Sequence, residues 1–117
     1  MKKIPAVALG LAAAAALAPP ALAHEHHSTV TVVAGQPSEY SFTLSAKAVA
    51  HGSVSFVVWN KGTVRHNFQI DGRTTPVIPP GESATLTVEL KKRGSYTYDS
   101  TLSGQAAAGM RGVLQVT

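Results

Sequence analysis

The sequence predicts an all-β protein, an antiparallel β-sandwich of seven or eight short strands, and three observations support this prediction. Apolar and polar residues alternate with a period of two in several segments, most clearly from Ala84 to Leu90. Turn signals such as Gly35-Gln-Pro37 and Asp71-Gly72 separate these segments. After residue 23 the apolar residues follow no helical period, so strands are expected to form the core.

The strands are expected where the alternation is found. In chain order they are residues 29–33, 40–44, 54–58, 66–70, 84–90, 96–98 and 113–116. Residues 46–52, 76–81 and 100–109 are expected to form loops. The side chains predicted to line the core are Val54, Phe56, Val58, Phe68, Leu86, Val88, Leu114 and Val116.

Residues 1–23 have the pattern of a secretory signal peptide. Lys2 and Lys3 precede an apolar run, Pro19 and Pro20 interrupt it, and Ala21-Leu22-Ala23 is a small-residue cleavage site. We predict cleavage after Ala23, which leaves a single domain over residues 24–117 that is exported to the periplasm or secreted. The run is short for a membrane span, and no second apolar segment of spanning length follows.

Composition narrows the possible functions. The formal charge is +4, and subtracting the two lysines of the signal peptide leaves +2. Because Lys91-Lys92-Arg93 is the only basic cluster and precedes a turn at Gly94, nucleic-acid binding is not expected. The chain has no cysteine, so it has no disulfide, no thiolate metal ligand and no thiol nucleophile.

A series of short motifs follows the order found in one family. They are Trp59-Asn60-Lys-Gly62, His66-Asn67-Phe68, Pro79-Pro-Gly81-Glu-Ser, Gly94-x-Tyr96-x-Tyr98 and Gly109-Met110-x-Gly112. Each motif is weak alone, but the ordered set resembles the cupredoxins, the blue-copper family that includes plastocyanin and azurin. The resemblance covers nearly all of residues 24–117. It implies a Greek-key β-sandwich, a copper cofactor and electron transfer.

The resemblance also implies a set of copper ligands, which are His, Cys, His and Met in that family. His66 matches the first histidine and Met110 the axial methionine, whereas Asp99 stands at the cysteine position and Gln105 at the second histidine. Asn67 matches the residue that connects the two ligand loops. Two of the four ligands are therefore predicted to be replaced.

The replaced ligands leave two alternatives for this pocket. Blue copper needs a thiolate and two imidazoles, while Asp99 and Gln105 offer only oxygen donors. The pocket is either a metal-free remnant, in which His66 is bonded to the Asp99 carboxylate, or a weak oxygen and nitrogen site for Cu(II) or Zn(II). Met110 is then core filling in the first case and a ligand in the second.

A second candidate metal site lies at the predicted mature N-terminus, His24-Glu-His26-His27. A free amine, two amide nitrogens and the His26 imidazole could hold Cu(II) in a square-planar site; alternatively, the amine and imidazole of His24 could bind together with His27. The alternative is a polar leader with no metal function. His51 is expected to be a solvated loop residue.

The function expected from these residues is that of a binding module. We predict an exported cupredoxin-like domain that handles copper or contacts a protein partner of unknown identity, without redox activity. The alternative is electron transfer by a copper site that lacks a thiolate. An enzyme is not expected, because no nucleophile and base are found at a catalytic spacing.

Overall fold

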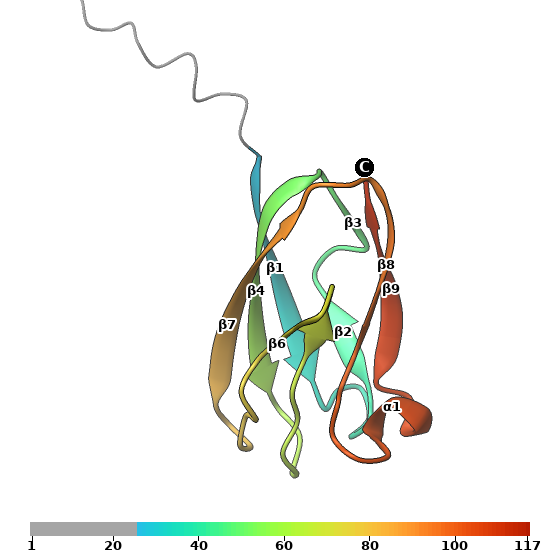
Figure 1. Ribbon diagram of the computed structural model, residues 1–117. Helices are drawn as coiled ribbons and strands as arrows, with labels where there is room; N and C mark the ends of the chain where they lie inside the picture. Colours follow the sequence, from blue (N-terminus) through green and yellow to red (C-terminus); the bar gives the residue numbers. More distant parts are fainter. Residues whose placement is uncertain (1–25) are drawn as a thin grey trace, which may run out of the picture.

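The computed structural model describes residues 26–117. The predicted signal peptide and His24 lie outside the described residues, so the predicted boundary at residue 24 stays a prediction. The described part contains nine strands and one short helix, which form two packed layers (Figure 1). None of its helices is long and apolar enough to cross a membrane.

The first layer is a four-stranded sheet in the order β2-β1-β4-β7. Its strands are β1 (His27–Ala34), β2 (Phe42–Leu44), β4 (Gly52–Asn60) and β7 (Ser83–Leu90). The second layer has the order β3-β9-β8-β5-β6. Its strands are β3 (Ala48–Val49), β5 (Gln69–Ile70), β6 (Arg73–Thr74), β8 (Gly94–Asp99) and β9 (Arg111–Val116).

The predicted β-sandwich is confirmed, but both sheets are mixed where an antiparallel arrangement was expected. β1 pairs in parallel with β4 along its whole length, from His27 opposite Ser53 to Ala34 opposite Asn60. β3 pairs in parallel with β9. After the β1–β2 hairpin the chain crosses to the other layer at β3 and returns beside β1. A strand pattern identifies strands but not their partners, so this crossover could not be predicted from alternation.

Two segments expected to be loops contain regular structure, and one expected strand is shorter than predicted. β3 lies within residues 46–52, and the helix α1 (Gln105–Ala108) lies within residues 100–109. The strand expected over residues 66–70 is reduced to β5, because His66 forms only an isolated bridge with Ile78. A four-residue helix is too short to give a detectable period in the sequence.

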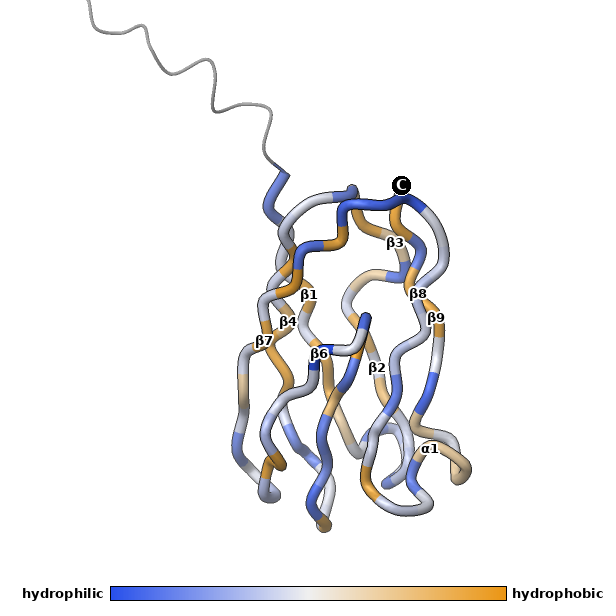
Figure 2. The backbone as a smooth tube through the Cα atoms, viewed as in Figure 1, coloured by the Kyte–Doolittle hydropathy of each residue, from blue (hydrophilic) through white to orange (hydrophobic). Residues whose placement is uncertain are grey.

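The core lies between the layers, as the alternation predicts. Seven of the eight predicted core side chains are at most 3% exposed, and Leu86 is partly buried against them. Further buried residues join the same cluster, namely Val30, Val32, Ala34, Ile70, Ile78, Leu90 and Met110. Figure 2 shows apolar colour along the strands and hydrophilic colour in the turn between β7 and β8. One hydrophobic core therefore fixes both ends of the sandwich, where the candidate sites lie.

Candidate functional site

The site around His66 lies at the end of the sandwich where β4 ends. Residues 61–65 turn away from β4, and the main chain of His66 then exchanges two hydrogen bonds with Ile78, with N···O distances of 3.2 and 2.7 Å. Asn60 stabilises this turn, because its side-chain amide donates to the carbonyl oxygens of Val64 and Ile78 at 2.8 Å each. The His66 side chain is completely buried, so its ring nitrogens must find partners within the protein.

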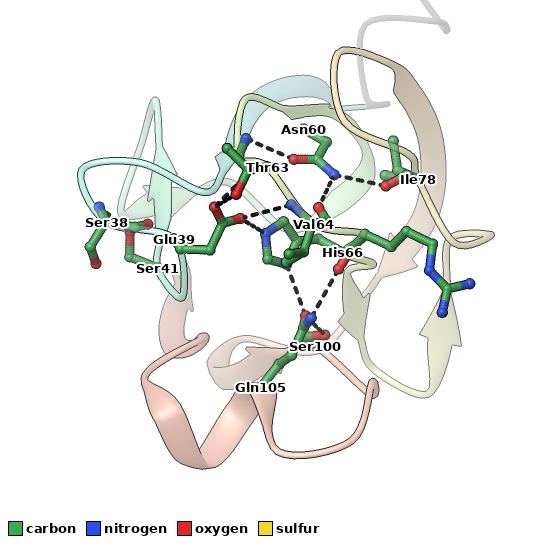
Figure 3. Close-up of polar contacts among 12 residues, drawn as sticks. Ser38, Glu39, Ser41, Asn60, Thr63, Val64, His66, Ile78, Ser100 and Gln105 are labelled. Carbon is green, nitrogen blue, oxygen red and sulfur yellow. Dashed lines mark hydrogen bonds and ion pairs between the residues drawn. The ribbon is translucent and has the colours of Figure 1, made fainter.

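Glu39, in the loop between β1 and β2, is the partner of one ring nitrogen. His66 Nε2 lies 2.6 Å from Glu39 Oε2 (Figure 3). The other carboxylate oxygen accepts hydrogen bonds from Thr63, at 2.8 Å from the main-chain nitrogen and 2.7 Å from Oγ1. These two bonds from Thr63, followed by the one from His66, lower the pKa of Glu39 from 4.5 to about 2. Glu39 is therefore an ionised carboxylate at neutral pH.

Gln105, the first residue of α1, is the partner of the other ring nitrogen. Its Oε1 lies 2.9 Å from His66 Nδ1, and its Nε2 donates to the carbonyl oxygen of Arg65 at 2.9 Å. The Arg65 carbonyl can only accept, so it fixes the orientation of the amide and turns Oε1 toward the imidazole.

Both contacts of the His66 ring are with oxygen atoms of the protein. A carboxylate oxygen and an amide oxygen both accept, so a ring nitrogen that carries a proton donates it to Glu39 or to Gln105. Both nitrogens that could otherwise bind a metal therefore face a protein oxygen at hydrogen-bond distance.

Ser100 and Asn67 extend the network behind Gln105. The Ser100 hydroxyl lies 2.9 Å from Gln105 Oε1 and 3.0 Å from Asn67 Oδ1, so its single proton serves two acceptors. Asn67 also accepts from the Thr101 main-chain nitrogen at 2.9 Å and donates to Thr101 Oγ1 at 2.7 Å. The prediction that Asn67 connects the two loops is confirmed.

The structure brings three of the four predicted pocket residues to one region and excludes the fourth from the network. Met110 is completely buried, and its main chain bonds to Gln105 and Ser100. Asp99 ends β8, opposite Gln69 and Arg111. The predicted bond between His66 and the Asp99 carboxylate is wrong, because Glu39 and Gln105 occupy the two ring nitrogens.

Strand alternation explains this error. Tyr96 and Tyr98 pack against the core, so Ser100, two residues further along the same strand direction, also points inward and is 2% exposed. Asp99 lies between them and points to the other side. A shift of one residue exchanges the two faces. Ser100, which stands five residues before Gln105, therefore faces Gln105, and Asp99 does not.

The cluster is closely enclosed by neighbouring residues. The ring of Tyr40 meets that of His66 edge-on, with centroids 6.1 Å apart. A Cβ atom on Gly62 would overlap Glu39 Oε2 and lie 3.0 Å from His66 Nε2, so only glycine leaves room for this pair. Outside, a shallow depression of about 310 Å³ is lined by Tyr40, Val64, Arg65, Leu102, Ser103 and Gln105.

The residues of this pocket do not fit a type 1 copper ion. Such a site needs a thiolate and two imidazoles in a trigonal arrangement. The chain has no cysteine, and the cluster supplies one imidazole, whose two nitrogens both contact protein oxygens. Among residues 26–117, no three His, Asp or Glu side chains are grouped so that they could hold a metal ion.

The predicted N-terminal site lies at the opposite end of the sandwich. His26 is the first described residue, and His27 begins β1 with its side chain exposed. Burial alternates along β1, so His27 is on the solvent face with Thr29 and Thr31. A metal at these histidines remains a prediction, because His24 lies outside the described residues.

Two residues of the network were not predicted from the sequence. Ser100 could have been found by extending the alternation of Tyr96 and Tyr98 by two positions. Glu39 had no local signal, because it reaches His66 only through the fold, across 27 residues of sequence.

Solved structures of auracyanins and rusticyanin share this fold. Auracyanin B is 24% identical, covering 77% of this chain and 88% of its own, with a TM-score of 0.65. Auracyanin A, a "blue" copper protein from Chloroflexus aurantiacus, is 16% identical, covering 79% and 100%, with a TM-score of 0.64. Rusticyanin from Thiobacillus ferrooxidans is 20% identical, covering 77% of each chain, with a TM-score of 0.65.

Similarity at these identities shows a shared fold, and the expected cupredoxin architecture is confirmed. No curated protein matches the chain in sequence. The family model for multicopper oxidases matches residues 53–117, which include His66, Ser100, Gln105 and Met110. Because this match covers more than half of the sequence, the chain belongs to the multicopper oxidase family and is a copper-protein domain with the cupredoxin fold.

Proposed function

We propose that the chain is an exported cupredoxin-like module that handles copper or binds a protein partner without transferring electrons. In this proposal the former copper pocket holds a hydrogen-bonded network in place of a metal. The single observation that carries the proposal is that both ring nitrogens of the buried His66 have protein partners. Nε2 lies 2.6 Å from Glu39 Oε2, and Nδ1 lies 2.9 Å from Gln105 Oε1.

The physical argument concerns competition between a hydrogen-bond network and a metal ion. A metal at His66 Nδ1 would have to displace Gln105 Oε1 from this nitrogen and separate two groups that satisfy each other. The donors available in return are an amide oxygen, a hydroxyl and a thioether, none of which is a strong ligand for Cu(II). The network is therefore favoured over metal in this pocket.

A partner-binding role is supported by the surface above the network. Tyr40 and Val64 are 40% and 38% exposed beside the depression that leads to Gln105. Exposed aromatic and aliphatic groups next to a buried polar anchor are typical of contact surfaces. We propose no catalytic role, because the hydroxyl and imidazole groups of the network are buried and bonded within the protein.

The second candidate is electron transfer by a thiolate-free copper ion, and one observation favours it. A carboxylate bonded to the outer nitrogen of a metal-binding histidine is a frequent arrangement, and Glu39 holds Nε2 in this way. Auracyanin A, which has the same fold, is described as a "blue" copper protein. In this case the metal would use Nδ1, near Gln105 and Met110.

The two candidates are distinguished by spectra and redox measurements on the protein as the cell processes it. We expect no reversible redox couple after Cu(II) addition. Met110→Leu keeps the core volume and removes the thioether, and it should leave the electron-paramagnetic spectrum unchanged. A redox couple that shifts in Met110→Leu would establish the second candidate instead.

Export is tested separately by sequencing the N-terminus of the mature protein. The signal pattern of residues 1–23 predicts that the chain begins at His24. Recovery of the protein in the cytoplasm with residues 1–23 attached would contradict the export part of the proposal.

A further inference from the structure

A pair of histidines meets at the end of the sandwich opposite His66. The rings of His26 and His51 lie edge to face, with centroids 5.6 Å apart and an interplanar angle of 61°. β4 begins directly after His51, at Gly52, and ends at Asn60 beside the His66 site, so the two histidine sites lie at opposite ends of one strand. In Figure 1 this is the end where β1 starts and where the C-terminus lies.

The orientation of the His51 ring is fixed by the main chain. Its main-chain nitrogen donates to the main-chain oxygen of Thr117 at 2.9 Å, and its Nδ1 lies 3.0 Å from the same oxygen. Since this oxygen accepts from Nδ1, Nδ1 carries the proton, and in the neutral ring Nε2 has a free lone pair. A histidine that donates one nitrogen to a carbonyl or carboxylate oxygen and presents the other is the usual form of a metal ligand.

His26 is held against His51 by the backbone. Its carbonyl oxygen accepts a hydrogen bond from the main-chain nitrogen of Ser53 at 3.1 Å. Gly52, with φ of 134°, allows this approach, because a Cβ atom there would lie 2.6 Å from the His26 carbonyl oxygen. The His26 side chain itself is exposed. The two imidazoles therefore meet on an anchored backbone, with His26 exposed and His51 half-buried.

We propose that His26 and His51 together bind a divalent transition-metal ion, with Cu(II) preferred. Two neutral imidazoles suit Cu(II), which stands highest among the first-row divalent ions in affinity for nitrogen sites, and water would complete the coordination. This pair would be the site at which the proposed copper-handling role takes place. Only the choice of copper rests on that proposed function.

This site differs from the N-terminal one expected from the sequence. It uses His51, which the sequence assigned to a solvated loop, and it does not need the terminal amine. It also leaves out His27, which lies on the solvent face of β1. The basic turn Lys91-Lys92-Arg93 follows Leu90, which lies opposite Gly52. These like charges should weaken cation binding at low ionic strength, and added salt should screen them.

The test is a Cu(II) titration of the protein in the form that the cell produces after any processing. Calorimetry measures the affinity, and electron-paramagnetic resonance reports the ligands. His51→Asn keeps a donor near Thr117 where Nδ1 stands but removes Nε2, and we expect it to lower the Cu(II) affinity by at least about tenfold. His26→Asn should have a similar effect. His27→Asn is the matched control on the neighbouring residue and should leave the affinity unchanged. Far-UV circular dichroism checks that each variant is folded.

Four outcomes would overturn the inference. Three are the absence of Cu(II) binding, an unchanged affinity in His51→Asn, and a loss of affinity in His27→Asn equal to that in His26→Asn; the fourth concerns the N-terminus. An alanine inserted between Ala23 and His24 should leave binding intact; loss of binding in that variant alone would assign the metal to the terminal amine. None of these outcomes involves Met110 or a redox couple, so failure here is distinguishable from failure of the proposed function.

Discussion

At the scale of single residues, the site depends on which side chains stand where cupredoxins have their copper ligands. Ser100 and Gln105 face each other at 2.9 Å, and Gln105 contacts His66 Nδ1 at the same distance. A thiol at position 100 and an imidazole at position 105 would therefore be directed at the same point as Nδ1. Asp99 lies on the opposite face of β8 and is not so directed.

This geometry predicts which substitutions would create a blue-copper site. Ser100→Cys combined with Gln105→His should supply a thiolate and a second imidazole beside His66, with Met110 nearby, and should give an intense visible band with Cu(II). Asp99→Cys combined with Gln105→His is the matched control and should stay nearly colourless. Absorption spectra after Cu(II) addition decide between them, and a strongly coloured control would contradict the assignment of Ser100 to this position.

At the scale of elements, Asn67 holds two loops together. Its side-chain oxygen accepts hydrogen bonds from the main-chain nitrogen of Thr101 and from the Ser100 hydroxyl, and its side-chain nitrogen donates to Thr101 Oγ1. Asn67→Ala would leave buried donors unpaired and should lower the free energy of unfolding by about 1–3 kcal/mol. Thr101→Val, which loses only the Oγ1 bond, should cost about 1 kcal/mol. Urea denaturation measures both values, and equal costs would show that the main-chain bond contributes nothing.

Substitutions at neighbouring positions of β9 test whether the buried face of the strand contributes more to the free energy of unfolding than the exposed face. Leu114 is completely buried and its neighbour Val113 is 49% exposed. Leu114→Ala should lower the free energy of unfolding by about 2–5 kcal/mol, because it removes core contacts and leaves a cavity. Val113→Thr, the control on the other face, should change it by less than about 0.5 kcal/mol. Similar losses in both variants would mean that the register of β9 is wrong.

At the scale of the whole molecule, the pair of Glu39 and His66 links the β1–β2 loop to the turn after β4. The pKa of Glu39 is lowered from 4.5 to about 2 in the folded protein, chiefly by the two hydrogen bonds from Thr63. A carboxylate with a lowered folded-state pKa stabilises the protein above its unfolded-state value. That stability is lost as the pH falls from about 4.5 through about 2.

The corresponding prediction is a change in acid stability. Glu39→Gln should be less stable than the original protein above pH 4.5, and its stability should fall less steeply between pH 4.5 and 2. Urea denaturation at a series of pH values measures this slope. Glu89→Gln, on the exposed face of β7, is the control and should leave the steep fall in place. An unchanged slope in Glu39→Gln would show that the carboxylate is not held as described.

Much of the architecture could be predicted from the sequence because local patterns determine it. Period-two alternation identified the long strands and seven buried core residues, and the ordered motifs from Trp59 to Gly112 indicated the cupredoxin fold, which the fold shared with auracyanin B confirms. The absence of cysteine already excluded a thiolate copper site. His66 and Gln105 were correctly expected to come together.

The remaining features were decided by tertiary structure, since they depend on contacts between residues distant in sequence. Parallel pairing of β1 with β4 follows from a crossover that no local pattern records. Glu39 meets His66 because two loops converge at one end of the sandwich, and His51 meets His26 because β1 and β4 begin side by side. Alternation and composition are properties of neighbouring residues, whereas hydrogen-bond partners and charge states arise only when distant side chains share a buried space.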